Sequence, residues 1–478
     1  MLARGTSKGH ARFAAEPAGL DAAPGRAKIG ASASGSLPDP PRRPMPSRRS
    51  FLAGLAGAGL TAPALVPAFN PRAMLHAARA AEMTGGAPAL RAAEDEAYWG
   101  EIQRAFDADR TMINLNNGGV SPTPTHVLEQ MIRDLRFTNE LPVEHMWRVL
   151  EPRIESVRRE LAKDFGCDPE EMAITRNASE ANEIMIFGLD LRRGDEVIVT
   201  TQNYPRMLTA WEQRERRDGV VLKRITFPLP PRSAQEIVDR FAAAITPRTR
   251  VIEVTHITNL SGHIMPVREL VELARPKGIE VLVDGAHAYA HFPFTRDQLG
   301  CDYYGTSLHK WLLAPIGTGF LYVRKAKQKT LWPMMAAPAS MDEDVRKYEE
   351  TGTHPAANHN AIAAALAFHR SIGAERKAAR LRYLRDRWAR RLTSESPRIR
   401  LLTHLDAVNS GAIGLFSVEG MDMARLQGWL LEKHRIVTTP IIHPEFQGIR
   451  VTPNVYTTLD EVDRFAETVL LAARRGIA

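Results

Sequence analysis

Apolar side chains recur at helical spacing through residues 144–165. Positions three and four residues apart share one face of a helix, so this pattern predicts an amphipathic helix with one buried side. Gly166 follows at once and is a common helix terminator. The predicted buried face consists of Met146, Leu150, Ile154, Val157, Leu161 and Phe165.

Beyond residue 165 the pattern changes to short apolar runs separated by helical patterns such as 233–244 and 267–274. Near-continuous apolar strands that alternate with helices are typical of a largely parallel sheet covered on both faces. The prediction is therefore an α/β large domain in three layers with a seven-stranded sheet. Its strands are expected at 172–175, 197–201, 220–227, 251–255, 281–284, 303–306 and 320–323.

After residue 345 a long helical pattern, dense in Ala, Leu and Arg, covers 361–392 and leads to a smaller α+β unit ending at residue 478. We divide the chain into an N-terminal arm with a substrate loop (81–140), a large ligand-binding domain (141–345), and a linking helix with a small C-terminal domain (346–478). In an open parallel sheet, ligands bind beyond the carboxyl ends of the strands.

The net charge of +8 comes from the start of the chain. Residues 1–80 contain 11 of the 63 Lys and Arg residues but 3 of the 55 Asp and Glu residues, so the rest carries 52 of each sign. A nucleic-acid surface needs a basic patch on the folded domain, so no nucleic-acid partner is expected.

Residues 45–80 resemble an export signal. Arg48 and Arg49 precede a smooth apolar run at 52–66, and a small-residue cleavage sequence follows at 78–80. The arginine pair resembles a twin-arginine signal, which predicts export of the folded protein to the periplasm or the extracellular space by the twin-arginine machinery. The run is too short and too rich in Gly to predict a membrane span. A chance arginine pair and a cytoplasmic enzyme are the alternative.

Met45 lies where such signals begin, so we hypothesise that translation starts there. Residues 1–44 are rich in Ala, Gly, Pro, Ser and Arg and show no periodicity, which predicts disorder.

The two cysteines, Cys167 and Cys301, lie far apart without metal-ligand spacing, and each is expected to be a small buried side chain. No metal site is predicted.

Three motifs lie where strands of the predicted sheet end. Asp284 ends an apolar strand and precedes Gly-Ala-His287, so its carboxylate could pair with a protonated ring nitrogen in the ligand crevice, or simply cap the next helix. Lys310 follows the next strand, where apolar neighbours could desolvate its amine for Schiff-base chemistry, although most lysines are solvated. Ser179 opens a helix after residues 172–175, as a phosphate cradle or an ordinary cap would.

The order of these motifs resembles the class V aminotransferases, which are fold-type-I enzymes that use pyridoxal 5'-phosphate (PLP). The resemblance covers about residues 112–475 and implies PLP held as a Schiff base on Lys310, which also moves protons. It implies that Asp284 partners the pyridine nitrogen and that His287 contacts the ring hydroxyl. It assigns further cofactor contacts to Ala178 (through its amide), Ser179, Tyr204, Asn259, Ser307 and His309.

The same resemblance implies a substrate site and a dimer. Arg450 matches the residue that binds the substrate carboxylate, a task for which a planar fork of donors is suited. Asn117, in Asn-Asn-Gly-Gly, matches a substrate-facing loop, although a plain turn explains this sequence equally well. Thr353 matches a residue that reaches the phosphate in the neighbouring subunit, which implies a homodimer with shared sites.

The reaction is less defined than the cofactor. Residues 438–448 contain no Cys, so desulfuration through a protein persulfide is not expected. The pattern is nearest to the isopenicillin N epimerase-like branch, which implies transamination or epimerisation of an amino acid after Cα–H removal. A β-elimination or C–S lyase reaction and an exported binding protein on an inactive scaffold are the alternatives.

Overall fold

The computed structural model describes residues 89–477. The segment 1–44, the signal at 45–80 and the first residues of the N-terminal arm lie outside the described residues, so these remain predictions. Within residues 89–477, no helix has the length and apolar character that crossing a membrane requires.

A seven-stranded sheet forms the centre of the large domain, in the order β2-β8-β7-β6-β5-β3-β4. β8 is antiparallel to β2 and to β7, and every other neighbouring pair is parallel. The prediction of a largely parallel sheet is therefore confirmed. Its strands are β2 (Met172–Thr175), β3 (Glu196–Thr200), β4 (Val221–Ile225), β5 (Thr249–Thr255), β6 (Glu280–Asp284), β7 (Tyr303–Ser307) and β8 (Gly319–Val323).

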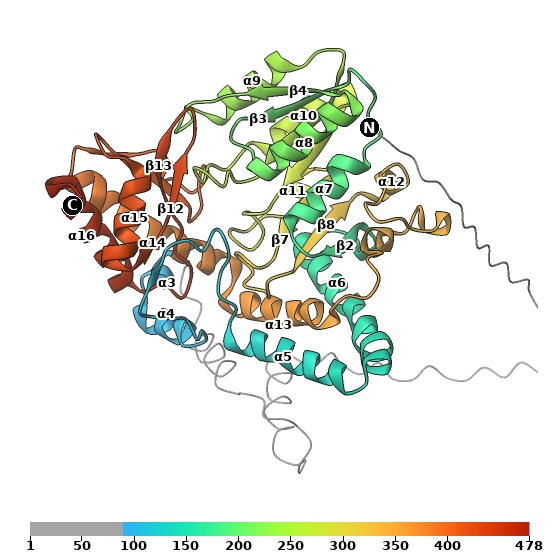
Figure 1. Cartoon of the computed structure of the whole chain (residues 1–478), viewed down its shortest axis with the longest axis horizontal. Helices are drawn as coiled ribbons and strands as arrows, with labels where there is room; N and C mark the ends of the chain where they lie inside the picture. Colours follow the sequence, from blue (N-terminus) through green and yellow to red (C-terminus); the bar gives the residue numbers. More distant parts are fainter. Residues whose placement is uncertain (1–88, 478) are drawn as a thin grey trace, which may run out of the picture. The chain divides into compact units, whose positions relative to one another are not determined.

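Helices cover both faces of this sheet (Figure 1). On β3, Val197 and Val199 pack in one apolar cluster with the helices of one face, while Ile198 belongs to the cluster on the other. This alternation follows from the two-residue period of a strand. The first face carries α7 (Ala178–Gly188) and α8 (Pro205–Asp218), and the second carries α6 (Glu151–Phe165), α9 (Ala234–Ala244) and α10 (Val267–Ala274).

The helix predicted at 144–165 consists of two parts. The prediction is corrected for the first part, which is not an α-helix. Residues Val143–Leu150 form a π-helix, η1, in which the backbone N–H of Glu151 donates to the carbonyl of Met146, and α6 follows. Pro152 has no N–H and interrupts the α-helical ladder where the two parts join. The predicted apolar face is nevertheless buried at all six positions.

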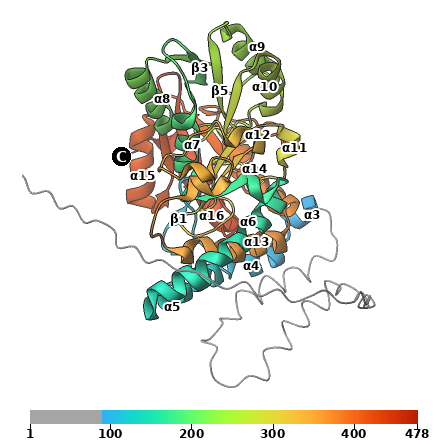
Figure 2. The same cartoon turned by 90° about the vertical axis from the view of Figure 1, so that its right-hand side faces the viewer.

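The single long helix predicted at 361–392 is wrong. The chain instead forms α13 (Ala356–Ile372) and α14 (Ala374–Glu395), separated by Gly373, whose φ of 87° lies outside helical backbone. α13 lies beside α5 (Thr125–Glu140) in both views (Figures 1 and 2). The helix break lets α13 pack on the large domain while α14 packs on the small one.

A four-stranded antiparallel sheet forms the small C-terminal part, in the order β12-β13-β10-β9. Its apolar cluster includes residues of α14, α15 (Met423–His434) and α16 (Leu459–Arg475), as an α+β unit requires. The strands are β9 (Ile399–Leu401), β10 (Gly414–Val418), β12 (Thr439–Ile442) and β13 (Gln447–Val451).

The N-terminal arm joins this small part. β1 (Ile113–Asn114) pairs in parallel with β11 (Ile436–Val437), and Asn116 then bridges to Thr452. Residues 116–119 are thereby brought next to the end of β13. The remaining elements are short: α3 (Ala89–Ala93), α4 (Glu96–Gln103), α11 (Arg296–Leu299), α12 (Lys325–Gln328), η2 (Pro169–Glu171), η3 (Arg275–Lys277), η4 (Ala339–Met341) and η5 (Val345–Glu349).

Candidate active site

A cavity of about 400 Å³ lies at the carboxyl ends of the large sheet, against the start of α7. This is the place where open parallel sheets bind ligands, and the volume suits a small-molecule site. The strands bring together most of the residues singled out in the sequence. Nine of them line the cavity: Ala178, Ser179, Tyr204, Asn259, Asp284, His287, Ser307, His309 and Lys310.

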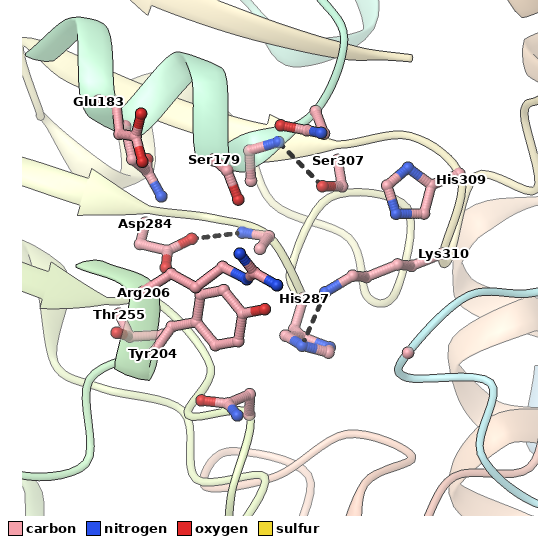
Figure 3. Close-up of a pocket in the computed structure, with 16 residues that line it drawn as sticks. Ser179, Glu183, Tyr204, Arg206, Thr255, Asp284, His287, Ser307, His309 and Lys310 are labelled. Atoms are coloured by element: carbon pink, nitrogen blue, oxygen red, sulfur yellow. Dashed lines mark hydrogen bonds between the residues drawn. The ribbon is translucent and has the colours of Figure 1, made fainter. Parts of the chain in front are cut away.

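Lys310 and His287 form a pair at this cavity. The distance between Lys310 Nζ and His287 Nε2 is 3.0 Å (Figure 3). Burial lowers the pKa of Lys310 to about 8, a value that includes a rise caused by Asp284 and a smaller decrease caused by the guanidinium of Arg450. Burial also holds the pKa of His287 well below its usual value. His287 is therefore a neutral imidazole that accepts a hydrogen bond from the lysine at Nε2.

Asp284 ends β6, is buried, and lines the cavity. The backbone N–H of Ala286 donates to its Oδ1 at 3.0 Å, as expected where a turn follows a strand. Burial raises the pKa of Asp284, whereas the Ala286 N–H, the Asn182 side chain and the charge of Lys310 oppose that rise. A buried carboxylate in this position is suited to accept a hydrogen bond from a protonated ring nitrogen.

The opposite end of the cavity has the groups of an anion site. Ser307 ends β7, and the backbone N–H of Ala178 at the start of α7 donates to its hydroxyl oxygen at 2.9 Å. Ser179 lies in the first turn of α7 and lines the cavity, where the helix dipole favours negative charge. The capping residue of α7 is Asn177, whose side chain accepts the Glu180 N–H at 3.0 Å. Ser179 is therefore not needed as the cap.

Several buried polar atoms around the cavity have no hydrogen-bond partner among residues 89–477. Each buried polar atom without a partner costs the folded protein about 1–3 kcal/mol of stability, unless a ligand or water forms a hydrogen bond with it. A ring with a hydroxyl and a phosphate group, as in PLP, would offer partners of this kind, so the residues present fit that cofactor. The atoms are Asn182 Oδ1, Thr255 Oγ1, Asn259 Oδ1, His287 Nδ1 and His309 Nδ1.

Arg450 lies on β13 and is buried. Its Nη1 donates to the backbone carbonyl of Asn259 at 3.0 Å, and its Nη2 donates to Asn116 Oδ1 at 2.8 Å. Within the described part of the chain its guanidinium has no carboxylate partner, and its Nε has no hydrogen-bond partner. Burial lowers its pKa to about 10. A buried cation without a counter-charge is costly and is suited to bind an anionic group.

Two predicted site residues do not line the cavity. The side chain of Asn117 is buried, donates to the Thr452 carbonyl at 2.9 Å and accepts from the Tyr456 hydroxyl at 2.6 Å. Its neighbours are closer to the site, since Gly119 lines the cavity and Asn116 contacts Arg450. Thr353 is exposed and outside the cavity of its own chain, so its contact with a neighbouring subunit remains a prediction.

Sequence reasoning missed several residues that line the site. Asn182 and Glu183 follow Ala178 by about one turn of α7, so the helical period could have indicated that they share its face. Thr255 pairs with Asp284 in the sheet, and Arg206 is two residues after Tyr204. Neither belonged to a sequence motif that indicated a site residue. None of the described residues forms a group of three or more His, Cys, Asp or Glu side chains suited to a metal.

The cysteines lie outside the cavity. Cys301 is buried as predicted, whereas Cys167 is only partly buried. Burial raises the pKa of each thiol to about 12, which keeps both as unreactive thiols at neutral pH.

The sequence is similar to isopenicillin N epimerases and to a probable cysteine desulfurase. Isopenicillin N epimerase from Streptomyces clavuligerus is 31% identical over 390 residues, which is 78% of this chain and 98% of that protein. The corresponding enzyme from Amycolatopsis lactamdurans is 29% identical with the same coverage. A probable cysteine desulfurase from Synechocystis is 29% identical over 55% of this chain and 64% of its own length.

Solved structures share the fold. The C-DES protein with glycine linked covalently to its PLP cofactor has a TM-score of 0.69 at 23% identity, covering 77% of this chain and 98% of that one. A cysteine desulfurase from Thermococcus onnurineus has a TM-score of 0.69 at 21% identity, covering 78% and 98% of the respective chains. These likenesses confirm the predicted PLP-transferase fold.

The sequence family described as aminotransferase class-V matches residues 113–465. This range includes the cavity, the Lys310–His287 pair and Arg450. The prediction of a PLP-dependent enzyme from three strand-end motifs is thereby confirmed, with the exact reaction left open. This chain belongs to the class V aminotransferase family.

Proposed function

We propose that this enzyme binds an amino acid through its carboxylate and removes the hydrogen at Cα, leading to epimerisation or transamination. The observation that carries the proposal is the Lys310–His287 pair, with its 3.0 Å separation, in a cavity that also contains Asp284. Arg450, which lacks a carboxylate partner among the described residues, supplies the binding group for the substrate carboxylate.

The residues divide the chemistry between them. Bound PLP supplies an aldehyde that bonds covalently to amines and a ring that withdraws electrons from Cα. Asp284 would hold the ring nitrogen of the cofactor in its protonated form, while Ser179, Ser307 and His309 would hold its phosphate. Lys310, whose pKa is about 8, can accept and return a proton at Nζ near neutral pH. His287 Nε2 accepts a hydrogen bond from that amine and orients it.

The isopenicillin N epimerases support this choice because they match nearly their whole length. The lack of Cys at 438–448 argues against a persulfide route. A β-elimination is the second candidate. It is favoured by partial matches such as the putative L-cysteine desulfhydrase 2 of Oryza sativa, 29% identical over 45% of this chain.

Borohydride reduction followed by mass mapping tests the site. We expect the cofactor mass on Lys310 of the reduced wild-type protein and no covalently attached cofactor in reduced Lys310→Ala. If protein that was active before reduction carries no cofactor mass on Lys310 afterwards, the proposal is contradicted.

Amino-acid panels in D₂O then test the reaction. We expect deuterium at Cα without loss of the amino group for an epimerase, and a keto acid only in the presence of an acceptor for a transaminase. Release of ammonia and a keto acid without an acceptor would instead establish β-elimination.

We also propose that the enzyme is exported by the twin-arginine pathway, on the basis of Arg48, Arg49 and the apolar run that follows. Cell fractionation with N-terminal sequencing tests this. We expect a mature protein outside the cytoplasm that begins near residue 81, and retention in the cytoplasm when both arginines are replaced by lysine. Export of that double variant would contradict the proposal.

A further inference from the structure

His291 lies behind the active site and joins two parts of the chain. It follows β6 in the turn that carries His287, and it is buried. Its Nδ1 is 2.7 Å from the backbone carbonyl of His287, and its Nε2 accepts the backbone N–H of Ala412 at 2.6 Å. Because an N–H can only donate, the Ala412 bond fixes the tautomer with the proton on Nδ1.

The imidazole of His291 also contacts the segment that carries Lys310. Its ring stacks on Trp311 with a centroid distance of 3.7 Å and an interplanar angle of 16°. Trp311 is the residue directly after Lys310, and its backbone carbonyl accepts a hydrogen bond from the buried amine of Lys377. His291 therefore touches the segments that carry both members of the Lys310–His287 pair.

Ala412 connects this histidine to the substrate side. It lies two residues before β10, and Leu415 of β10 pairs in register with Arg450. The approach is close, since a Cβ added to Gly411 would lie 2.4 Å from His291 Nε2. A backbone bond from Ile264 to Asn409, 2.8 Å long, ties the same loop to the hairpin that contains Asn259.

We propose that His291 is a positioning residue that fixes the spacing between the Lys310–His287 pair and the carboxylate-binding Arg450. The Nδ1 bond holds the backbone of His287, and the Nε2 bond holds the loop that leads to the strand beside Arg450. This inference rests on the proposed function, because the distance between the reactive amine and the carboxylate site matters only if one amino acid binds at both.

The surroundings keep the imidazole neutral, as both bonds require. Burial lowers the pKa of His291 to about 3, and the nearby cations Arg382, Lys377 and Arg385 lower it as well, although the bond to the His287 carbonyl opposes this. One nitrogen therefore stays a donor and the other an acceptor across the neutral pH range.

Three substitutions separate the two bonds. In His291→Asn, the side-chain N–H₂ group replaces Nδ1 and keeps the bond to His287. In His291→Gln, the longer amide places its oxygen near the former Nε2 and keeps the bond from Ala412. His291→Phe keeps the stacking on Trp311 but neither bond. His126→Phe is the control, because His126 is a partly buried histidine that packs on Phe368 outside this network.

The experiment has two readouts on the PLP-loaded enzyme and one on its folding. The pH titration of the visible cofactor band reports the placement of Lys310, and glycine titration of the same band reports carboxylate binding. Thermal denaturation of each variant measures stability separately. One lost hydrogen bond is worth about 1 kcal/mol, or roughly a fivefold change in an equilibrium constant.

We expect His291→Asn to keep the wild-type titration midpoint and to weaken glycine binding about fivefold. His291→Gln should shift the midpoint by about 0.7 pH unit and keep glycine binding, in line with the loss of one hydrogen bond. His291→Phe should change both readouts by these amounts. His126→Phe should change neither. If His291→Phe fails to fold, the Asn and Gln variants still decide the question.

The inference is overturned if His291→Phe matches the wild type in both readouts, or if the Asn and Gln variants lower only the denaturation temperature. A wild-type protein that shows no cofactor band, or no response to glycine, would overturn the proposed function and this inference together. A responsive wild type with an equally responsive Phe variant overturns the inference alone.

Discussion

Lys310 differs from an exposed lysine because burial lowers its pKa from 10.5 to about 8. The neutral amine is the form that attacks an aldehyde, so the shift raises its reactive fraction at neutral pH by more than a hundredfold. This is a consequence of its buried position after β7, near Asp284 and Arg450, and not of the residue type.

The rate at which cofactor-free protein takes up PLP should therefore depend on pH with a break near 8. Below that value the neutral fraction of Lys310 falls about tenfold per pH unit, and above it the rate should level off. Stopped-flow growth of the visible band between pH 6 and 10 measures this, with Lys310→Ala as the control that cannot form the covalent bond to residue 310. A rate that keeps rising up to pH 10 would contradict a lowered pKa.

Arg450 should discriminate by carboxylate geometry. Arg450→Lys keeps a positive charge but loses the planar fork that donates to Asn259 and Asn116, so glycine binding should weaken about tenfold or more. Methylamine, which lacks a carboxylate, should bind as before. Titrations of the cofactor band with both amines measure the two affinities, and an equal loss for both would instead indicate a general structural defect.

Single residues were predictable where a motif sits at the end of a strand. Asp284 and Lys310 each follow an apolar run, and this alone places them at the ligand edge of a parallel sheet. The sequence indicated the Asn-Asn-Gly-Gly loop but assigned the substrate contact to Asn117 and not to Asn116, because the contact of Asn116 with Arg450 depends on two segments 334 positions apart in the sequence. The neighbouring Asn117 carries the same side chain but points into hydrogen bonds with Thr452 and Tyr456.

At the scale of elements, the strands were easier to predict than the helix ends. Each of the seven predicted runs became a strand of the central sheet. Six of these strands are buried along most of their length, as near-continuous apolar runs predict, whereas the edge strand β4 is partly exposed and contains Lys223 and Arg224. The periodicity at 144–165 correctly gave the buried face but could not distinguish η1 from an α-helix. The change in backbone hydrogen bonding between η1 and α6 occurs at Pro152, and the spacing of apolar residues gives no information about backbone N–H groups.

Gly373 provides a test of why the long predicted helix divides. Its φ of 87° is strained for any residue with a Cβ, and nothing lies within 4 Å of an added Cβ, so Gly373→Ala should cost about 1–3 kcal/mol of conformational strain alone. Gly428 is the matched control, because it lies inside α15 with equal space and ordinary helical backbone.

Gly428→Ala should be stabilising by about 0.5–1 kcal/mol through lower backbone entropy in the unfolded chain. Thermal denaturation of both variants should therefore shift the midpoint in opposite directions. A midpoint that rises in Gly373→Ala would show that the break between α13 and α14 does not depend on this backbone conformation.

At the scale of the whole molecule, the site combines distant parts of the chain. The large sheet supplies Asp284 and Lys310, the small sheet supplies Arg450, and the N-terminal arm supplies Asn116 through the pairing of β1 with β11. Local sequence patterns predict the strands of the large sheet and an α+β unit at the C-terminus, but only the packed chain brings the three parts together.

A second copy of the chain should complete the phosphate end of the site. Thr353 is exposed and does not line the cavity of its own chain, which is the arrangement expected if its hydroxyl reaches a neighbouring subunit. Light scattering should therefore give a dimer mass, and Thr353→Ala should weaken PLP binding about fivefold through the loss of one hydrogen bond. The amino-acid KM at saturating PLP should stay unchanged, because Thr353 does not contact the substrate side.

Thr468→Ala is the control for that experiment, since the Thr468 hydroxyl donates to the Arg464 carbonyl of its own helix α16, its one hydrogen bond within residues 89–477. Dilution distinguishes a site shared between two chains from an effect of Thr353 within its own chain. If the partner's hydroxyl contributes, the PLP affinity of the wild-type protein should fall toward that of Thr353→Ala as the dimer dissociates. A monomer that binds PLP as tightly as the dimer would show that each chain holds the phosphate with its own Ser179, Ser307 and His309, and that Thr353 has no part in cofactor binding.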